Sequence, residues 1–136
     1  MRYTPETIIN LEPNQIFVFG SNLQGVHGAG AARLAHERFG ADYGVGEGMT
    51  GRSYALPTKD ENIKTRSLTK IQESFCSFIK CVLDNPHLDF LLTKVGCGLA
   101  GYSTDDIADV FWFSLEYNGQ VKIPRNLCVP KEFVDY

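Results

Sequence analysis

Long hydrophobic runs are absent from this 136-residue sequence. No apolar stretch approaches the roughly 20 residues of a membrane-spanning helix, and residues 1–14 hold no apolar segment after a basic one. We therefore expect no membrane span, no signal peptide and a cytoplasmic location. Because 43% of the residues are hydrophobic, there is enough apolar material for one core, and we expect a single domain over residues 1–136.

Excess positive charge is also absent. Lysine and arginine number 13 against 16 acidic residues, which gives a net charge of −3. Bulk electrostatics will not attract such a chain to nucleic acid, so we expect no non-specific nucleic-acid binding. An anionic small ligand would have to be held by local groups.

Metal-binding spacings are missing as well. The four cysteines form no C-x-x-C pair, and the three histidines stand at no ligand spacing from them, so we expect no metal site and no cofactor. Cys76 and Cys81 fall within an apolar helical pattern and are expected to be buried thiols. This cysteine usage indicates a reducing compartment.

The chain alternates strand, loop and helix patterns, which predicts an α/β layered fold with a mostly parallel central sheet. The segment 41–51 carries four glycines and is expected to be a flexible loop, and residues 1–14 are not placed. Ser67 and Ser103 are expected to cap the second and third helices. Strands are predicted at 15–20, 52–57, 88–95 and 126–130, and helices at 29–39, 67–84 and 103–118.

Two glycine-rich loops follow predicted strands, at 25–30 and 96–101. Glycine lets the backbone approach a ligand closely, and the free N–H groups at a helix start attract anions. The first loop lacks the Lys-Ser/Thr pair of a Walker-type phosphate loop. Because ligands of parallel sheets bind at the carboxyl ends of strands, the two loops predict a clamp for a diphosphate, with tight ligand-free turns as the alternative.

Three segments in order resemble motifs of the macrodomain family. Residues 22–32 resemble the N-x-x-G-x-x-G-x-G-I-A segment, residues 54–59 its second core strand, and residues 95–102 its second phosphate loop. The similarity is nearest the branch of terminal ADP-ribose protein glycohydrolases and ADP-ribose-1″-phosphate processors. It implies a three-layer α/β/α fold whose cleft holds ADP-ribose, or an ADP-ribosylated substrate.

The resemblance also implies a set of ligand-binding residues. Asn22 would contact the distal ribose, Tyr102 would stack on that ribose or close its loop, and backbone groups would hold the diphosphate. The residues carried over are Asn22, Gly25, His27, Gly28, Ala29, Gly30, Gly98, Leu99, Ala100, Gly101 and Tyr102. An acidic residue near the adenine, early in the chain, is a further family feature, for which Glu6 and Glu12 are the candidates.

Catalytic residues are less clearly marked. Lys59 matches the lysine that attacks the ribose in the glycohydrolases, but the partner aspartate position is Ala100, which favours binding over hydrolysis. Lys59 is a candidate nucleophile, a phosphate-binding charge or a solvated loop lysine. His27 is a candidate acid or base, or a wall of the site. The function predicted is binding of ADP-ribose or a related nucleotide, by a hydrolase, a non-catalytic reader or sequestering module, or an ADP-ribose-1″-phosphate phosphatase.

Overall fold

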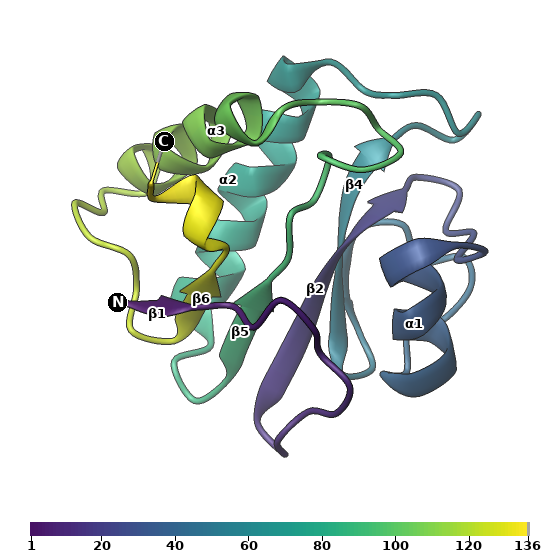
Figure 1. Cartoon of the computed structure of the whole chain (residues 1–136), viewed down its shortest axis with the longest axis horizontal. Coiled ribbons are helices and arrows are strands. Elements are labelled where there is room, and N and C mark those ends of the chain that lie inside the picture. The colour runs from purple at the N-terminus through teal and green to yellow at the C-terminus, as the bar shows by residue number, and fades with distance from the viewer. Residues whose placement is uncertain (136) are drawn as a thin grey trace.

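A computed structural model describes residues 1–135 and shows an α/β fold built on one six-stranded sheet (Figure 1). The strand order is β1-β6-β5-β2-β4-β3. The strands are β1 (Arg2–Tyr3), β2 (Gln15–Asn22), β3 (Gly48–Thr50), β4 (Ser53–Lys59), β5 (Asp89–Leu92) and β6 (Leu127–Val129). The helices are α1 (Gly30–Arg38), α2 (Leu68–Asp84) and α3 (Thr104–Tyr117), with a short 3-10 turn, η1, at Lys131–Phe133.

The sheet is mixed. β1, β6, β5, β2 and β4 pair in parallel, whereas β3 runs antiparallel to β4. The parallel strands end at a common edge, which brings together the residues after β2, β4 and β5.

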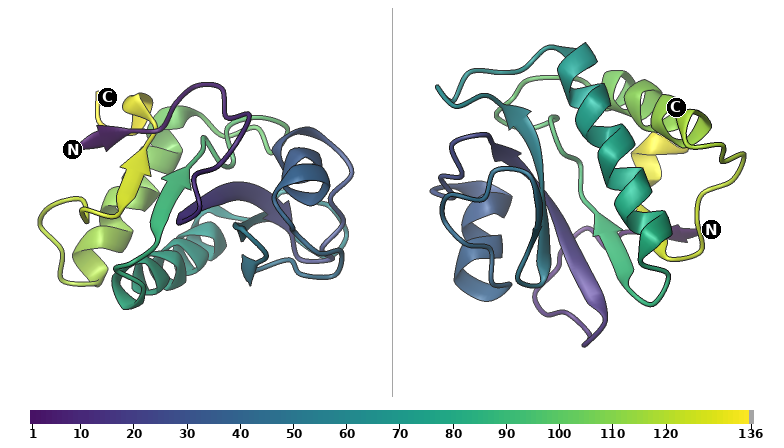
Figure 2. Two further views of the ribbon diagram at one scale, coloured as in Figure 1. Left: turned by 90° about the horizontal axis from the view of Figure 1, so that it is seen from below. Right: turned by 180° about the vertical axis from the view of Figure 1, so that it is seen from behind.

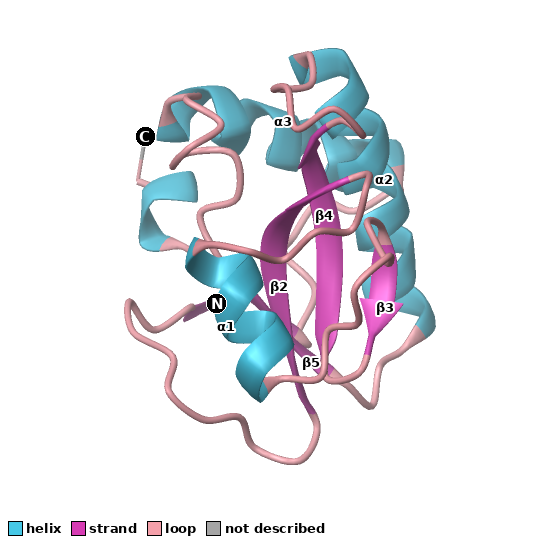
Figure 3. Ribbon diagram, turned by 90° about the vertical axis from the view of Figure 1, so that its right-hand side faces the viewer, coloured by secondary structure: helices cyan, strands magenta, loops and turns pink. Residues whose placement is uncertain are grey.

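β2 lies between β5 and β4 and is buried on both faces. Because successive side chains of a strand point to opposite faces, Ile16 and Val18 pack on one side and Phe17 and Phe19 on the other. The views show α2 and α3 on the first side and α1 on the second (Figures 2 and 3).

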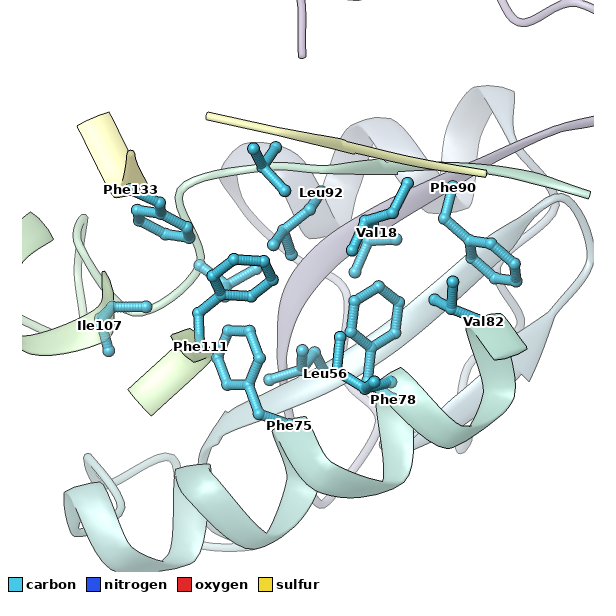
Figure 4. Packing of buried hydrophobic residues seen from close by; sticks show 14 of the residues in the cluster. Val18, Leu56, Phe75, Phe78, Val82, Phe90, Leu92, Ile107, Phe111 and Phe133 are labelled. Atoms are coloured by element: carbon cyan, nitrogen blue, oxygen red, sulfur yellow. The ribbon is translucent and has the colours of Figure 1, made fainter. Parts of the chain in front are cut away.

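The first side holds the larger hydrophobic cluster, here called the α2/α3 cluster. Helix α2 places an apolar face against the sheet at helical spacing, and rings from α2, β5, α3 and η1 interlock (Figure 4). Phe111, for example, has its ring centroid 6.3 Å from that of Phe75 and 6.1 Å from that of Phe133. The capping predictions are confirmed, because Ser67 and Ser103 accept hydrogen bonds from the N–H groups of Lys70 and Asp106.

The second side holds a smaller cluster, here called the α1 cluster. It contains Phe17, Phe19, Ala32, Ala35, Phe39, Ala41 and Ala55. Because the alanine side chains on α1 and β4 are small, the helix can pack close to the sheet.

The loop prediction for 41–51 is wrong in part. Residues 48–50 form β3, which pairs with β4 through the two-residue turn Gly51–Arg52. Gly51 has a φ of +59°, the left-handed conformation that such hairpin turns favour. The high glycine content predicts mobility, whereas in the structure Gly51 forms the turn of a hairpin.

Other boundaries also differ from the expectation. The predicted strand 88–95 pairs only over Asp89–Leu92, and β1 falls in the segment that had no assignment. β1 is too short to show an alternating pattern, and it exists because it pairs with β6. Within residues 1–135, no helix is both long enough and apolar enough to cross a membrane.

Candidate functional site

A cleft of about 450 Å³ lies at the edge of the sheet where β2, β4 and β5 end. Both glycine-rich loops line it, together with the first turn of α1. Its walls are Gly20, Ser21, Asn22, Val26, Gly28, Ala29, Gly30, Ala31, Ala32, Thr58, Lys59, Ile63, Thr93, Lys94, Val95, Gly96, Gly98, Leu99 and Ala100. The structure thus brings together two loops that are some 70 residues apart in the sequence.

The first loop is closed by its own Asn22. The Asn22 side-chain amide donates to the Val26 carbonyl at 2.8 Å and accepts from the Val26 N–H at 3.1 Å. These bonds fix the loop shape before any ligand arrives. Asn22 lines the cleft, but the contact with a distal ribose that the resemblance implies would have to share this amide.

The segment 41–51 lies behind the first loop and does not line the cleft. The Gly44 N–H donates to the Gly25 carbonyl at 2.9 Å, and the Ser21 hydroxyl donates to the Gly46 carbonyl at 2.5 Å. A side chain on Gly25 would collide with the backbone of Gly44, and one on Gly46 would lie 2.5 Å from the Asn22 carbonyl. The two backbones are therefore in direct contact, and this segment supports the first loop.

Helix α1 begins without a side-chain cap. Ala29 occupies the N-cap position and provides no side-chain hydrogen bond, whereas α2 and α3 start at serines. Gly28, Ala29 and Gly30 are exposed on the cleft wall. The first N–H groups of a helix need an acceptor from outside the helix, so this wall offers free donors and the positive end of a helix dipole.

The second loop presents further free donors. The Gly101 N–H donates to the Gly98 carbonyl at 3.0 Å, which makes a turn with Leu99 and Ala100 at its tip. Within residues 1–135, the N–H groups of Gly98, Leu99 and Ala100 donate to no backbone carbonyl. Tyr102 fastens this loop from outside the cleft, because its hydroxyl donates to the Arg66 carbonyl at 2.6 Å.

The charge of the cleft comes from two lysines. Lys59 makes no ion pair with any residue from 1 to 135, while Lys94 pairs with Glu132 at 3.1 Å. The hydrogen bond to Glu132 raises the pKa of Lys94, which stays charged at neutral pH. Among the described residues that line the cleft there is no carboxylate. The cleft therefore suits an anion.

A smaller pocket of about 250 Å³ adjoins the cleft and shares Ala31, Thr93 and Lys94 with it. Its walls are mostly apolar, from Ile8, Phe17, Leu34, Leu92 and Pro130, and it holds two carboxylates, of Glu6 and of the Glu132 that pairs with Lys94. This is where the structure places Glu6, one of the two early acidic residues. Glu12 is elsewhere, and its backbone is bonded to Gln15 and Arg52.

His27 does not line the cleft. Its side chain is 1% exposed and packs behind the first loop, with Phe19 edge-on at 5.3 Å and Tyr43 stacked at 5.6 Å between ring centroids. Its Nε2 donates to the Asp42 carbonyl at 2.8 Å. This position does not favour a role as acid, base or ligand wall. A polar residue in a loop gives no sequence signal for such burial.

Some of the other predicted site residues line the cleft, and some do not. Asn22, Gly28, Ala29, Gly30, Lys59, Gly98, Leu99 and Ala100 line the cleft, whereas Gly25, Gly101 and Tyr102 shape the loops without lining it. His36 is half-buried, and its Nδ1 bonds to the Ala41 carbonyl at 2.7 Å.

The four cysteines are free thiols, of which Cys128 is buried and the other three are half-buried. Cys76 and Cys81 are half-buried and not fully buried as expected, because each lies at the border of the apolar face of α2. Burial raises the pKa of Cys97 to about 11, and its Sγ donates to the Val95 carbonyl at 3.6 Å. Within residues 1–135 no group of histidine, cysteine and carboxylate side chains could hold a metal ion.

Sequence reasoning missed cleft residues outside the two glycine-rich loops, among them Thr58, Ile63, Thr93 and Lys94. Lys94 lies near the end of the predicted strand 88–95, and because β5 ends at Leu92, Lys94 stands just beyond the strand, at the edge of the sheet. Ile63 lies in a loop between β4 and α2, and no local pattern marks it.

No family model, curated protein or solved structure matches this chain.

Proposed function

We propose that the cleft binds ADP-ribose or a closely related nucleoside diphosphate with a terminal sugar. The observation that carries this proposal is the convergence of free backbone N–H groups from two loops, at Gly28–Gly30 and Gly98–Ala100, on the walls of one cleft without a carboxylate. Such donors, with the α1 dipole and two lysines, suit a diphosphate.

The lining of the two cavities supports an orientation for the ligand. The adjoining pocket is mostly apolar, and the Glu6 carboxylate there would accept hydrogen bonds from an amino group of a base. The diphosphate would lie between the two loops. The terminal sugar would then occupy the far end of the cleft, beside Lys59 and Ile63.

We propose further that the chain is a macrodomain-like protein with a three-layer arrangement, in which α1 lies on one side of the sheet and α2 and α3 lie on the other. We also propose that the protein is located in the cytoplasm.

A binding role is favoured over hydrolysis. No carboxylate lines the cleft within residues 1–135, and His27 is held in the core. Lys59 is the one chemical candidate that remains in the cleft, and it would act in this proposal as a charge for the diphosphate or sugar hydroxyls. Hydrolysis of an ADP-ribosyl bond or of ADP-ribose-1″-phosphate is the second candidate, and Lys59 at the sugar end is what favours it.

Calorimetric titration with ADP-ribose, ADP, AMP and ATP tests the proposal, and Gly28→Glu is the decisive variant. Gly28 has an ordinary φ, and an added Cβ would meet only Val26 Cγ1 at 4.0 Å, so the variant should fold. The new carboxylate would occupy the anion site, and we expect ADP-ribose affinity to fall at least 50-fold. Gly28→Gln, of similar size but neutral, should lose clearly less.

The absence of heat with every nucleotide up to millimolar concentration would refute the proposed function. Equal affinities of wild type and Gly28→Glu would refute the assignment of the first loop. Release of ADP-ribose from a modified protein, or of phosphate from ADP-ribose-1″-phosphate, that is lost in Lys59→Met would establish the hydrolytic candidate instead.

A further inference from the structure

The loop between β4 and α2 contains an unusual backbone. Ile63 has a φ of +60°, and it is the one non-glycine residue from 1 to 135 with a positive φ. For a β-branched side chain the left-handed region is strongly disfavoured. Strain of this kind persists only where the surroundings enforce it, and it concentrates at functional sites.

Asp60 enforces this conformation. One oxygen of its carboxylate accepts from the N–H groups of Asn62 at 2.8 Å and Lys64 at 3.0 Å. The Ile63 N–H donates to the Asp60 carbonyl at 3.1 Å, and the Asp60 N–H donates to the Lys64 carbonyl at 2.8 Å. The backbone hydrogen bonds, the largest cause being that from Lys64, hold the pKa of Asp60 below its usual range, so the carboxylate is charged at neutral pH. We call residues 60–64 the tip.

The tip is joined to the second glycine loop. Lys59 and Thr65 form an isolated antiparallel bridge at its base. The Thr65 hydroxyl donates to the Ala100 carbonyl at 3.1 Å. These bonds fix the position of the tip relative to the cleft wall that Leu99 and Ala100 form.

Three exposed apolar side chains line the cleft. Val26 and Ile63 are each 42% exposed and Leu99 is 83% exposed, and all three line the cleft. Each stands in a turn closed by a hydrogen bond. The Val26 N–H donates to the Asn22 side chain, the Asn62 N–H donates to the Asp60 carboxylate, and the Gly101 N–H donates to the Gly98 carbonyl. Exposed apolar groups gathered around one groove mark a surface that a ligand covers.

We infer that the tip holds Ile63 in its strained conformation so that its side chain covers the sugar ring beyond the diphosphate, and that Ile63 thereby selects sugar-terminated nucleoside diphosphates. This inference rests on the proposed function. The adjoining base pocket lies at the ends of β5 and β6, whereas Ile63 follows β4 on the other side of β2, so Ile63 stands at the sugar end of the cleft.

The chemistry of the side chain fits a sugar better than a phosphate. The C–H face of a ribose ring gains from burial against an aliphatic side chain, while its hydroxyls remain free to bond Lys59 or water. A terminal phosphate in the same place would lose hydration against Ile63 and Leu99 without gaining a donor from either.

Titration of the whole protein with ADP-ribose and with ADP tests whether Ile63 favours a terminal sugar over a terminal phosphate. In Ile63→Gly the apolar group is lost and the strain is relieved, so the protein should keep its fold, with a Tm within about 3 °C of wild type. We expect its Kd for ADP-ribose to rise about fivefold and its Kd for ADP to change less than twofold. Ile63→Val keeps a β-branched apolar side chain and should retain most of the preference.

Two further variants serve as controls. Val121→Gly removes an exposed apolar side chain that lies outside the cleft and should change neither affinity. Ile63→Asn also tolerates a positive φ and repeats the comparison if the glycine variant is unstable.

The outcomes are distinct. Wild-type protein that binds neither nucleotide refutes the proposed function. Wild-type protein that binds both, with Ile63→Gly lowering both affinities equally or neither, leaves the proposed function standing and overturns the role of Ile63.

Discussion

The two sides of the sheet are built for different tasks. The α2/α3 cluster is packed with large side chains and has both of its helices capped by serine. The α1 cluster is thin, rich in alanine, and its helix begins uncapped at the wall of the cleft. The difference indicates that most of the packing that stabilises the fold lies in the α2/α3 cluster. The α1 cluster is less stabilised locally, but it leaves backbone N–H groups free at the cleft and lets the backbones of neighbouring segments lie close together.

The largest expected effect on stability comes from removing a large side chain from the α2/α3 cluster. Phe111 is fully buried between other rings, and Phe111→Ala should lower the free energy of unfolding by about 3–5 kcal/mol. Phe39→Ala on the α1 side should cost clearly less, because Phe39 lies at the helix end within a small cluster. Urea unfolding followed by circular dichroism measures both, and an equal or larger loss for Phe39→Ala would contradict the comparison.

A smaller effect on stability is expected from substitution of His27. This substitution tests whether a residue that is buried in the α1 cluster, and does not line the cleft, contributes to ligand binding. His27→Phe keeps a ring against Phe19 and Tyr43 and removes an Nδ1 that is buried without a partner within residues 1–135. The Asp42 carbonyl would still accept from the Val45 N–H at 3.4 Å. Stability should change by no more than about 1 kcal/mol, and ADP-ribose affinity by less than twofold.

His27→Ala is the matched control, because it removes the ring and should lower stability by about 2–3 kcal/mol. If His27→Phe folds normally but abolishes ligand binding or turnover, the assignment of His27 to the core alone is wrong.

The smallest effect concerns Cys97, which belongs to the second glycine loop in sequence but packs against the α2/α3 cluster. Burial raises its pKa to about 11, so the thiol is neutral at pH 8 and should alkylate slowly with iodoacetamide. Because unfolding returns this thiol to its usual pKa near 9, its contribution should lower stability as pH rises from about 9 to 11.

Mass spectrometry of alkylated peptides at pH 8 and pH 10 checks this prediction. Cys97→Ser provides the control for the pH dependence of stability. Rapid labelling of Cys97 at pH 8 would show an accessible thiolate and place Cys97 with the cleft.

The elements that form the α2/α3 cluster are the part of the fold that the sequence predicts best. The apolar spacing from Leu68 to Val82 follows one helix face, and strong local signals at Ser67 and Ser103 mark where α2 and α3 begin. These features are local, so a single sequence contains them. The parallel pairing of β2 with its neighbours follows from the same order of strands and helices.

The site was only partly predictable. The glycine loops follow strand ends, which is a local signal, and they line the cleft. The burial of His27, the position of Ile63 and the approach of Glu6 depend on contacts between distant segments, and no local pattern reports them. The antiparallel β3 was missed because four glycines hid a three-residue strand.

The glycines of 41–51 have a consequence for how this cleft could be altered. Gly44 and Gly46 touch the back of the first loop, main chain against main chain, without reaching the cleft. A Cβ on Gly46 would lie 2.5 Å from the Asn22 carbonyl oxygen and 2.8 Å from the Leu23 backbone, so a side chain there would displace the chain that leads into the first loop, whereas a Cβ on Gly44 would meet nothing within 4 Å. Substitutions at Gly46 would therefore change the shape of this wall of the cleft from behind, while leaving intact every residue that lines the cleft.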